Sequence, residues 1–114
     1  MNDKAFNQLQ TKLLNTNAKL SEIKGQINEK EFEENRAKIT LREIDTLAPT
    51  AATYQRVGRM FVLTEQEELR QQLQATLEKS TQDLVTLRSQ LQYTEHNLQD
   101  LQKNLQELFR SSRS

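Results

Sequence analysis

Residues 47–63 read LAPTAATYQRVGRMFVL and decide the fold, because the helical spacing of apolar residues stops here. Threonine, tyrosine, valine and phenylalanine, all of which favour strands, lie in two short runs on either side of Gly58. A glycine between two such runs favours a turn or a bulge, since glycine readily takes a positive φ. The segment therefore predicts a β-hairpin with strands near 53–57 and 60–63.

The second predicted strand is apolar on both faces. Successive side chains of a strand point to opposite faces, so Met60 and Val62 share one face while Phe61 and Leu63 share the other. A two-stranded hairpin is marginal alone in water, and its free edges accept further strands. Other chains must supply these strands, so we expect the hairpin to be an assembly surface. Its residues are Tyr54, Val57, Gly58, Met60, Phe61, Val62 and Leu63.

Before this segment the sequence predicts a helix over residues 2–47. Apolar residues recur there with alternating gaps of three and four, which keeps them on one side of a slightly underwound helix and calls for a partner helix. Asn2 or Asp3 suits the N-cap, and Pro49 ends the helix. The seam of this helix is Phe6, Leu9, Leu13, Thr16, Leu20, Ile23, Ile27, Lys30, Glu34, Ala37, Leu41 and Ile44.

The same spacing returns after the hairpin and predicts a second helix over residues 64–110, with a frayed tail over 111–114. Thr64 followed by Glu67 is typical of a capping box, in which each side chain accepts a hydrogen bond from the other residue's backbone amide. The seam of this helix is Leu73, Leu77, Ser80, Leu84, Leu87, Leu91, Thr94, Leu98, Leu101, Leu105 and Leu108.

Two seams of similar length joined by a short connection can face each other if the chain folds back on itself. We expect an all-α dominated fold in one domain: a long antiparallel two-helix coiled-coil hairpin with a small β-hairpin inserted between the helices. Leu13 would lie near the level of Leu98 to Leu101. The alternative is a parallel homodimer through one helix, which would leave the other leucine seam exposed to water and prone to aggregation.

The hairpin motif resembles that of a known family. The stretch from Tyr54 to Leu63, with Val-Gly-Arg-Met-Phe at 57–61, is similar to the strand motif of the eukaryotic subunit-one branch of the prefoldins. The arrangement of helix, single hairpin and helix resembles a β-type prefoldin subunit, whereas α-type subunits carry two hairpins. The resemblance implies a hetero-hexamer of two α-type and four β-type chains, in which pooled strands form β-barrels. It also implies that the helical pairs hold unfolded clients such as actin and tubulin and pass them to the cytosolic chaperonin.

The far ends of the two helices predict a second surface. Phe109 directly follows Leu108, so both side chains cannot occupy the seam, and at least one apolar group should stay partly exposed. We expect these ends to bind apolar segments of unfolded clients, the alternative being ordinary end-packing of the coiled coil. The predicted client-binding residues are Ala5, Phe6, Leu9, Leu101, Leu105, Leu108 and Phe109.

Composition excludes several classes of function. Only 34% of residues are hydrophobic, too few for a large internal core, and 16 basic residues balance 16 acidic ones without forming a basic stripe. We therefore expect no nucleic-acid binding and no membrane association. The chain has no cysteine, and its N-terminal residues are polar rather than signal-like, so a cytoplasmic location is expected, with nuclear duties left open.

Catalytic chemistry is not expected either. No glycine-rich phosphate-binding motif occurs, so the chain should need no cofactor and should hold clients without ATP. We expect His96, the one histidine, to be a solvated residue without an ordered carboxylate partner, and so a poor metal ligand. The glutamates between 29 and 34 are expected to be a solvated helix face. A structural coiled-coil adaptor or tether is the alternative function, and a nucleic-acid accessory protein a more distant one.

Overall fold

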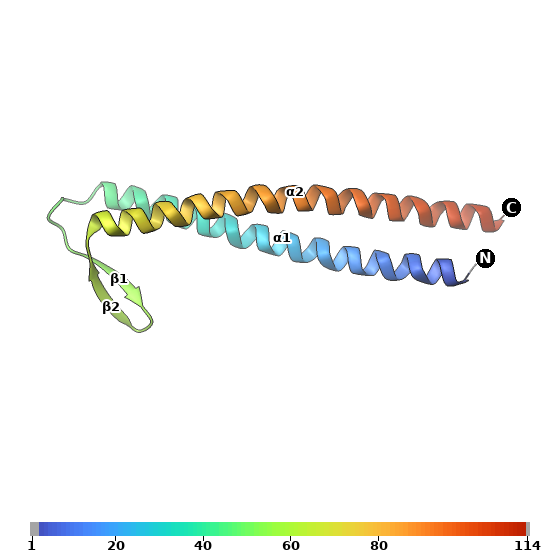
Figure 1. The fold of residues 1–114 in the computed structure, drawn as a ribbon, viewed down its shortest axis with the longest axis horizontal. Helices are drawn as coiled ribbons and strands as arrows, with labels where there is room; N and C mark the ends of the chain where they lie inside the picture. The colour runs from blue at the N-terminus through green and yellow to red at the C-terminus, as the bar shows by residue number, and fades with distance from the viewer. Residues whose placement is uncertain (1–2, 114) are drawn as a thin grey trace. The chain divides into compact units, whose positions relative to one another are not determined.

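The structure is a computed structural model that describes residues 3–113. Its elements follow in the order α1 (Asp3–Asp45), β1 (Thr53–Val57), β2 (Met60–Thr64) and α2 (Gln66–Arg113) (Figure 1). The predicted fold class is confirmed: two long helices carry a two-stranded antiparallel hairpin between them.

Helix α1 ends two residues before the predicted boundary. Asp45 is its last residue, and the chain then tightens into a turn in which the Thr46 amide donates to the Glu43 carbonyl at 3.2 Å. Pro49, which lacks a donor and disfavours helix in the residue before it, follows shortly. Asn2, the alternative N-cap, lies outside the described residues.

The capping box predicted at Thr64 is wrong. Thr64 is the last residue of β2, where it pairs with Thr53, and its hydroxyl donates to the Val62 carbonyl at 3.2 Å. Helix α2 begins at Gln66, with the Glu65 carbonyl accepting the Leu69 amide at 3.0 Å. The Thr64 backbone pairs with Thr53 in the sheet, so it is not available to the capping box.

The predicted frayed tail is also corrected, because α2 continues as a helix through residues 111–113. Ser114 lies outside the described residues.

The chain divides into two compact units, and both helices contribute to each. Of the described residues, one unit contains 3–28 and 85–113, and the other contains 29–84, including the hairpin. Within each unit α1 and α2 are antiparallel. Phe6 contacts Phe109 in the first unit, while Lys30 contacts Asp83 in the second.

Within each unit, α1 and α2 pack against each other along the predicted seams. Every seam position predicted above is buried or half-buried. The antiparallel pairing within one chain therefore buries both seams, as the parallel homodimer would not. The buried seam positions are Ile23, Ile27 and Thr94 in the first unit and Ala37, Ile44, Ser80 and Leu84 in the second.

Candidate functional site

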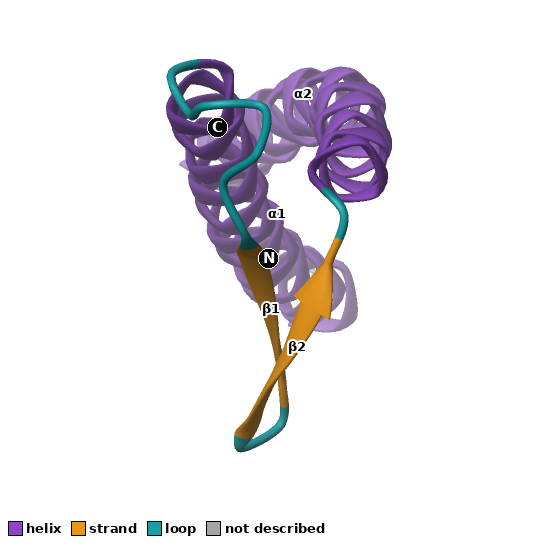
Figure 2. Cartoon of the chain, turned by 90° about the vertical axis from the view of Figure 1, so that its left-hand side faces the viewer, coloured by secondary structure: helices purple, strands orange, loops and turns teal. Residues whose placement is uncertain are grey.

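The β-hairpin has a fixed register and a tight turn (Figure 2). Val57 pairs with Met60 across the two-residue loop Gly58–Arg59, and the ladder continues to Thr53 opposite Thr64. Gly58 has a φ of +62°, and no other described residue has a positive φ. A positive φ at the first loop residue alone is the requirement of a type II′ turn, which suits the twist of paired strands. The turn predicted at Gly58 is thus present.

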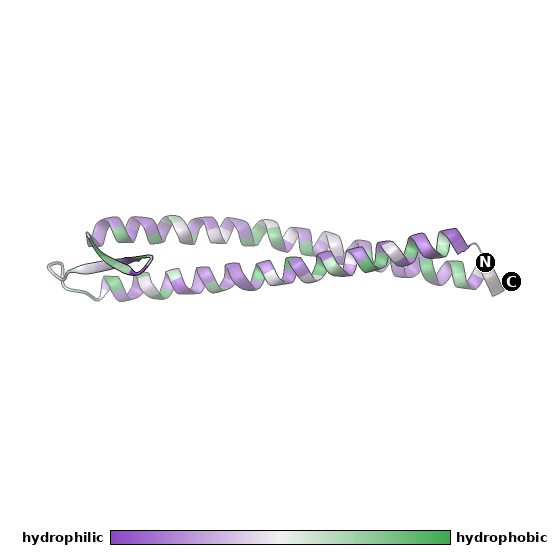
Figure 3. Ribbon diagram, turned by 90° about the horizontal axis from the view of Figure 1, so that it is seen from below, coloured by the Kyte–Doolittle hydropathy of each residue, from purple (hydrophilic) through white to green (hydrophobic). Residues whose placement is uncertain are grey.

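Both faces of this hairpin present apolar side chains to water. Directly paired residues share a face, so Tyr54, Phe61 and Leu63 lie on one face together with Arg56. Exposure of the four apolar residues of β2, Met60 to Leu63, runs from 42% for Val62 to 70% for Phe61. Figure 3 shows β2 as the more hydrophobic of the two strands. The predicted assembly residues other than Gly58 are exposed apolar side chains: Tyr54, Val57, Met60, Phe61, Val62 and Leu63.

The base of the hairpin is tied to its own unit by polar contacts that sequence reasoning missed. The Gln55 amide donates to the Gln72 side chain of α2 at 2.9 Å, and the Thr53 hydroxyl bonds to the Thr64 carbonyl. The side-chain amide of Gln66 donates to two loop carbonyls, those of Ala48 at 2.9 Å and Ala51 at 2.8 Å. These bonds hold the base of the hairpin, whereas its apolar side chains, from Tyr54 and Leu63 to the turn, stay exposed.

The N-terminal end of α1 and the C-terminal end of α2 both belong to the first unit, and their predicted client-binding residues, Ala5, Phe6, Leu9, Leu101, Leu105, Leu108 and Phe109, are called the arm tip. The rings of Phe6 and Phe109 meet edge to face, with centroids 5.5 Å apart and planes at 65°. Phe109 remains 41% exposed while Leu108 is half-buried, as expected for neighbours that cannot both enter the seam. The other predicted tip residues, Ala5, Leu9, Leu101 and Leu105, are half-buried. The structure thus brings this set together at one end of its unit and leaves it partly open to water.

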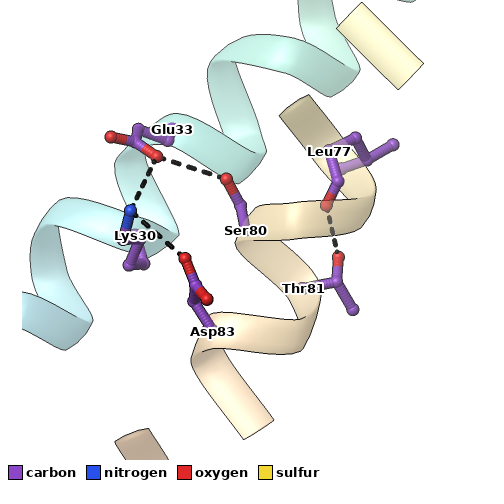
Figure 4. Close-up of polar contacts among 6 residues, drawn as sticks. All are labelled: Lys30, Glu33, Leu77, Ser80, Thr81 and Asp83. Carbon is purple, nitrogen blue, oxygen red and sulfur yellow. Dashed lines mark hydrogen bonds and ion pairs between the residues drawn. The ribbon is translucent and has the colours of Figure 1, made fainter. Parts of the chain in front are cut away.

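A polar layer interrupts the seam of the second unit (Figure 4). Lys30 Nζ lies 3.4 Å from a carboxylate oxygen of Asp83 and 3.4 Å from one of Glu33. The buried Ser80 hydroxyl donates to the same Glu33 oxygen at 3.2 Å. Asp83, and after it Glu33, raise the pKa of Lys30 above its ordinary value, because both stabilise the ammonium form.

The neighbouring turn extends this layer. The Thr81 hydroxyl lies 3.1 Å from a carboxylate oxygen of Glu34 and 2.9 Å from the Leu77 carbonyl. The prediction of a solvated glutamate face is therefore wrong for Glu34, whose side chain is 20% exposed, whereas Glu33 stays 48% exposed although it also reaches α2. The polar layer consists of Lys30, Glu33, Glu34, Ser80, Thr81 and Asp83.

Some large apolar side chains lie outside the seams, and sequence reasoning did not single them out. On α1, Phe32 and Ile39 are 67% and 51% exposed, and their seven-residue spacing places them on one face. Heptad positions opposite a seam are normally polar, so apolar residues at those positions were the available signal. Leu14, Val85 and Tyr93 are exposed on the first unit.

The described residues offer little for catalysis or metal binding. None of their histidine, aspartate and glutamate side chains form a group of three or more placed to hold a metal ion. His96, predicted to have no carboxylate partner, in fact lies 3.9 Å from Asp100 one turn along α2, and both side chains are solvated. None of the described helices has an apolar stretch long enough to cross a membrane.

Comparison with known proteins points to one family. The family model described as "Prefoldin subunit" matches residues 7–112. The chain is 29% identical to "Probable prefoldin subunit 1" of Dictyostelium discoideum, covering 96% of each protein. It is 30% identical to "Prefoldin subunit 1" of Arabidopsis thaliana, covering 91% of this chain and 81% of that protein. It is 29% identical to the human "Prefoldin subunit 1", covering 97% of this chain and 91% of that protein.

A solved structure has the same fold. The crystal structure of the prefoldin beta subunit from Thermococcus strain KS-1 aligns with a TM-score of 0.79 over 91% of each chain, at 23% sequence identity.

Proposed function

This chain belongs to the prefoldin subunit family, and we propose that it is an ATP-independent holding subunit of a prefoldin hexamer. Membership confirms the resemblance first seen in the hairpin motif. Members of the family are chaperone subunits rather than enzymes, and they assemble with other prefoldin subunits. The hexamer would contain two α-type and four β-type chains, with this chain as one of the β-type.

One observation supports assembly through the hairpin above all others. Two apolar faces and two open strand edges project from a unit whose own seam is already closed. An exposed, apolar strand is an aggregation hazard unless another chain covers it. A tether built on the coiled coil alone would need a short polar loop at this place.

Placing a charge in the hairpin tests this proposal. Phe61→Asp introduces a carboxylate on an apolar face, which should exclude the chain from its complex with other prefoldin subunits on size-exclusion chromatography. The helices should remain, as judged by circular dichroism, because Phe61 contributes nothing to the seams. Thr50→Asp is the matched control, since it adds the same charge in the exposed loop before β1. Co-elution of the Phe61→Asp chain with all its partners would leave the coiled-coil adaptor as the better reading.

We assign client binding to the arm tip. Phe6, Phe109 and the half-buried leucines around them give a small apolar surface that can hold unfolded segments without a sequence code. The clients would be unfolded chains such as actin and tubulin, received in the cytoplasm and handed to the cytosolic chaperonin. Handover to that second machine would release the client, since this chain is proposed to use no nucleotide.

Removing the apolar tip tests client binding separately from assembly. Deleting residues 1–9 and 109–114 should abolish the suppression of client aggregation, followed by light scattering, while the hexamer still forms. The double variant Phe6→Ser, Phe109→Ser should act in the same direction. Leu14→Ser is its control, because Leu14 is 72% exposed but lies outside the tip. If the shortened chain still suppresses client aggregation as well as the wild type, the tip residues only pack the ends of the helices together.

A further inference from the structure

The hairpin carries positive charge with nothing acidic to balance it. Residues 53–64 contain Arg56 and Arg59 and no aspartate or glutamate. Arg59 lies in the turn and is exposed to water. Arg56 lies within β1, directly opposite Phe61, and so shares a face with Tyr54 and Leu63. One cation therefore stands in the middle of an apolar surface.

The hydrogen bonds of Arg56 within the chain leave most of its donors unused. Its Nε donates to the Gly58 carbonyl at 3.1 Å, which holds the side chain along the strand toward the turn. A guanidinium has five N–H donors, and the other four are on its two terminal nitrogens. The structure gives these no carboxylate partner among the described residues.

Covering this face in an assembly changes the energetics of Arg56. Arginine stays ionised inside proteins, so it cannot escape burial by losing a proton. A buried charge without a partner is strongly unfavourable, whereas a carboxylate can accept two parallel bonds from the terminal nitrogens. A partner that buries the apolar neighbours of Arg56 must therefore also place an anion next to its guanidinium.

We propose that Arg56 selects the neighbouring subunit: it binds an aspartate or glutamate carboxylate that another prefoldin subunit presents on the face of Tyr54, Phe61 and Leu63. The inference rests on assembly through the hairpin, and it adds the chemistry of the partner. Subunits that place an apolar or basic residue there are rejected, because the guanidinium would be buried unpaired. A second copy of this chain is rejected for the same reason, since its hairpin has no acidic residue to offer.

Charge reversal measures this pairing. Arg56→Glu should weaken binding to the other subunits by at least about 30-fold, in the range found when one partner of a buried charge pair is lost. The neutral Arg56→Gln should weaken it in the same direction. Arg59→Glu changes the net charge equally but lies in the solvated turn, so it should weaken binding by less than about 5-fold. Circular dichroism of each variant checks that its helices are retained.

Cross-linking identifies the partner carboxylate. In the assembled complex of the Arg56→Lys variant, a carbodiimide should join the new amine to a carboxylate of one other subunit, which mass spectrometry then locates. Arg59→Lys should give no comparable product. A cross-link confined to this chain, or equal effects of the two charge reversals, would overturn the assignment of Arg56 while leaving assembly through the hairpin intact. Failure of the wild-type chain to join any complex would instead remove the proposed function, and this inference with it.

Discussion

Truncation to alanine should destabilise the chain strongly at Leu84 and hardly at all at its neighbour Val85. Leu84 is 1% exposed in the seam of α2, whereas Val85, the next residue, is 65% exposed. Leu84→Ala removes three carbons from a buried site, and at about 0.8 kcal/mol per carbon this is a loss of about 2.4 kcal/mol. The remaining cavity adds to this loss, although a seam between two helices can partly close over it. We expect a total of about 2–3 kcal/mol.

Val85→Ala should leave stability nearly unchanged. A side chain so exposed loses little burial, about 0.5 kcal/mol, and the higher helix propensity of alanine offsets a similar amount. The two variants should therefore differ by about 2 kcal/mol or more in the free energy of unfolding.

Urea denaturation followed by circular dichroism measures this difference. With a slope of about 2 kcal/mol per molar urea, Leu84→Ala should lower the midpoint by about 1 M and Val85→Ala hardly at all. Repeating the measurement at tenfold higher protein concentration shows whether self-association contributes. Equal midpoints for the two variants would refute the claim that this seam, rather than helix propensity, holds the helices together.

The polar layer predicts that stability falls at alkaline pH. The pKa of Lys30 is raised in the folded chain, so its contribution to the free energy of unfolding is present below its unfolded pKa of about 10.4 and is lost as pH rises through the folded value. The urea midpoint of Lys30→Met should then fall less than that of the wild type above pH 10, and parallel curves would contradict this. Gly58→Ala should destabilise by about 1 kcal/mol, since alanine resists the positive φ there, while Gly25→Ala, inside α1, should stabilise by about 1 kcal/mol. Neither added methyl meets an atom within 4 Å, so the same sign for both glycines in urea denaturation would show that backbone conformation does not decide the outcome.

Periodicity was enough to predict the helices and their buried faces. Gaps of three and four select one face of a helix whatever its partner is, so even polar seam positions such as Thr16 and Thr94 were placed correctly on the inside. The hairpin could be predicted equally well from the sequence, because strand-favouring residues flank a glycine that the turn requires. These signals are local, and local signals can be read from one sequence.

The errors arose where distant residues compete. Thr64 and Glu67 suit a capping box, but the pairing of Thr64 with Thr53 claims the same backbone. The contact between Ser80 and Glu33 joins residues 47 apart in sequence and depends on how the two helices are aligned, which periodicity leaves open. Likewise, nothing in a single sequence could place the Gln66 amide between two loop carbonyls.

The nesting of contacts around the hairpin has a consequence for folding kinetics. Gln66 meets Ala48 across 18 residues, Ser80 meets Glu33 across 47, and Phe6 meets Phe109 across almost the whole chain. Each doubling of the closed loop adds only about 0.6 kcal/mol of entropy cost, so a chain that starts at the turn can zip outward in small steps. Opening should run in reverse, beginning at the Phe6–Phe109 end. Native-state hydrogen exchange should then show the fastest amides there and the slowest in the helix turns next to the hairpin, around the buried Ile44.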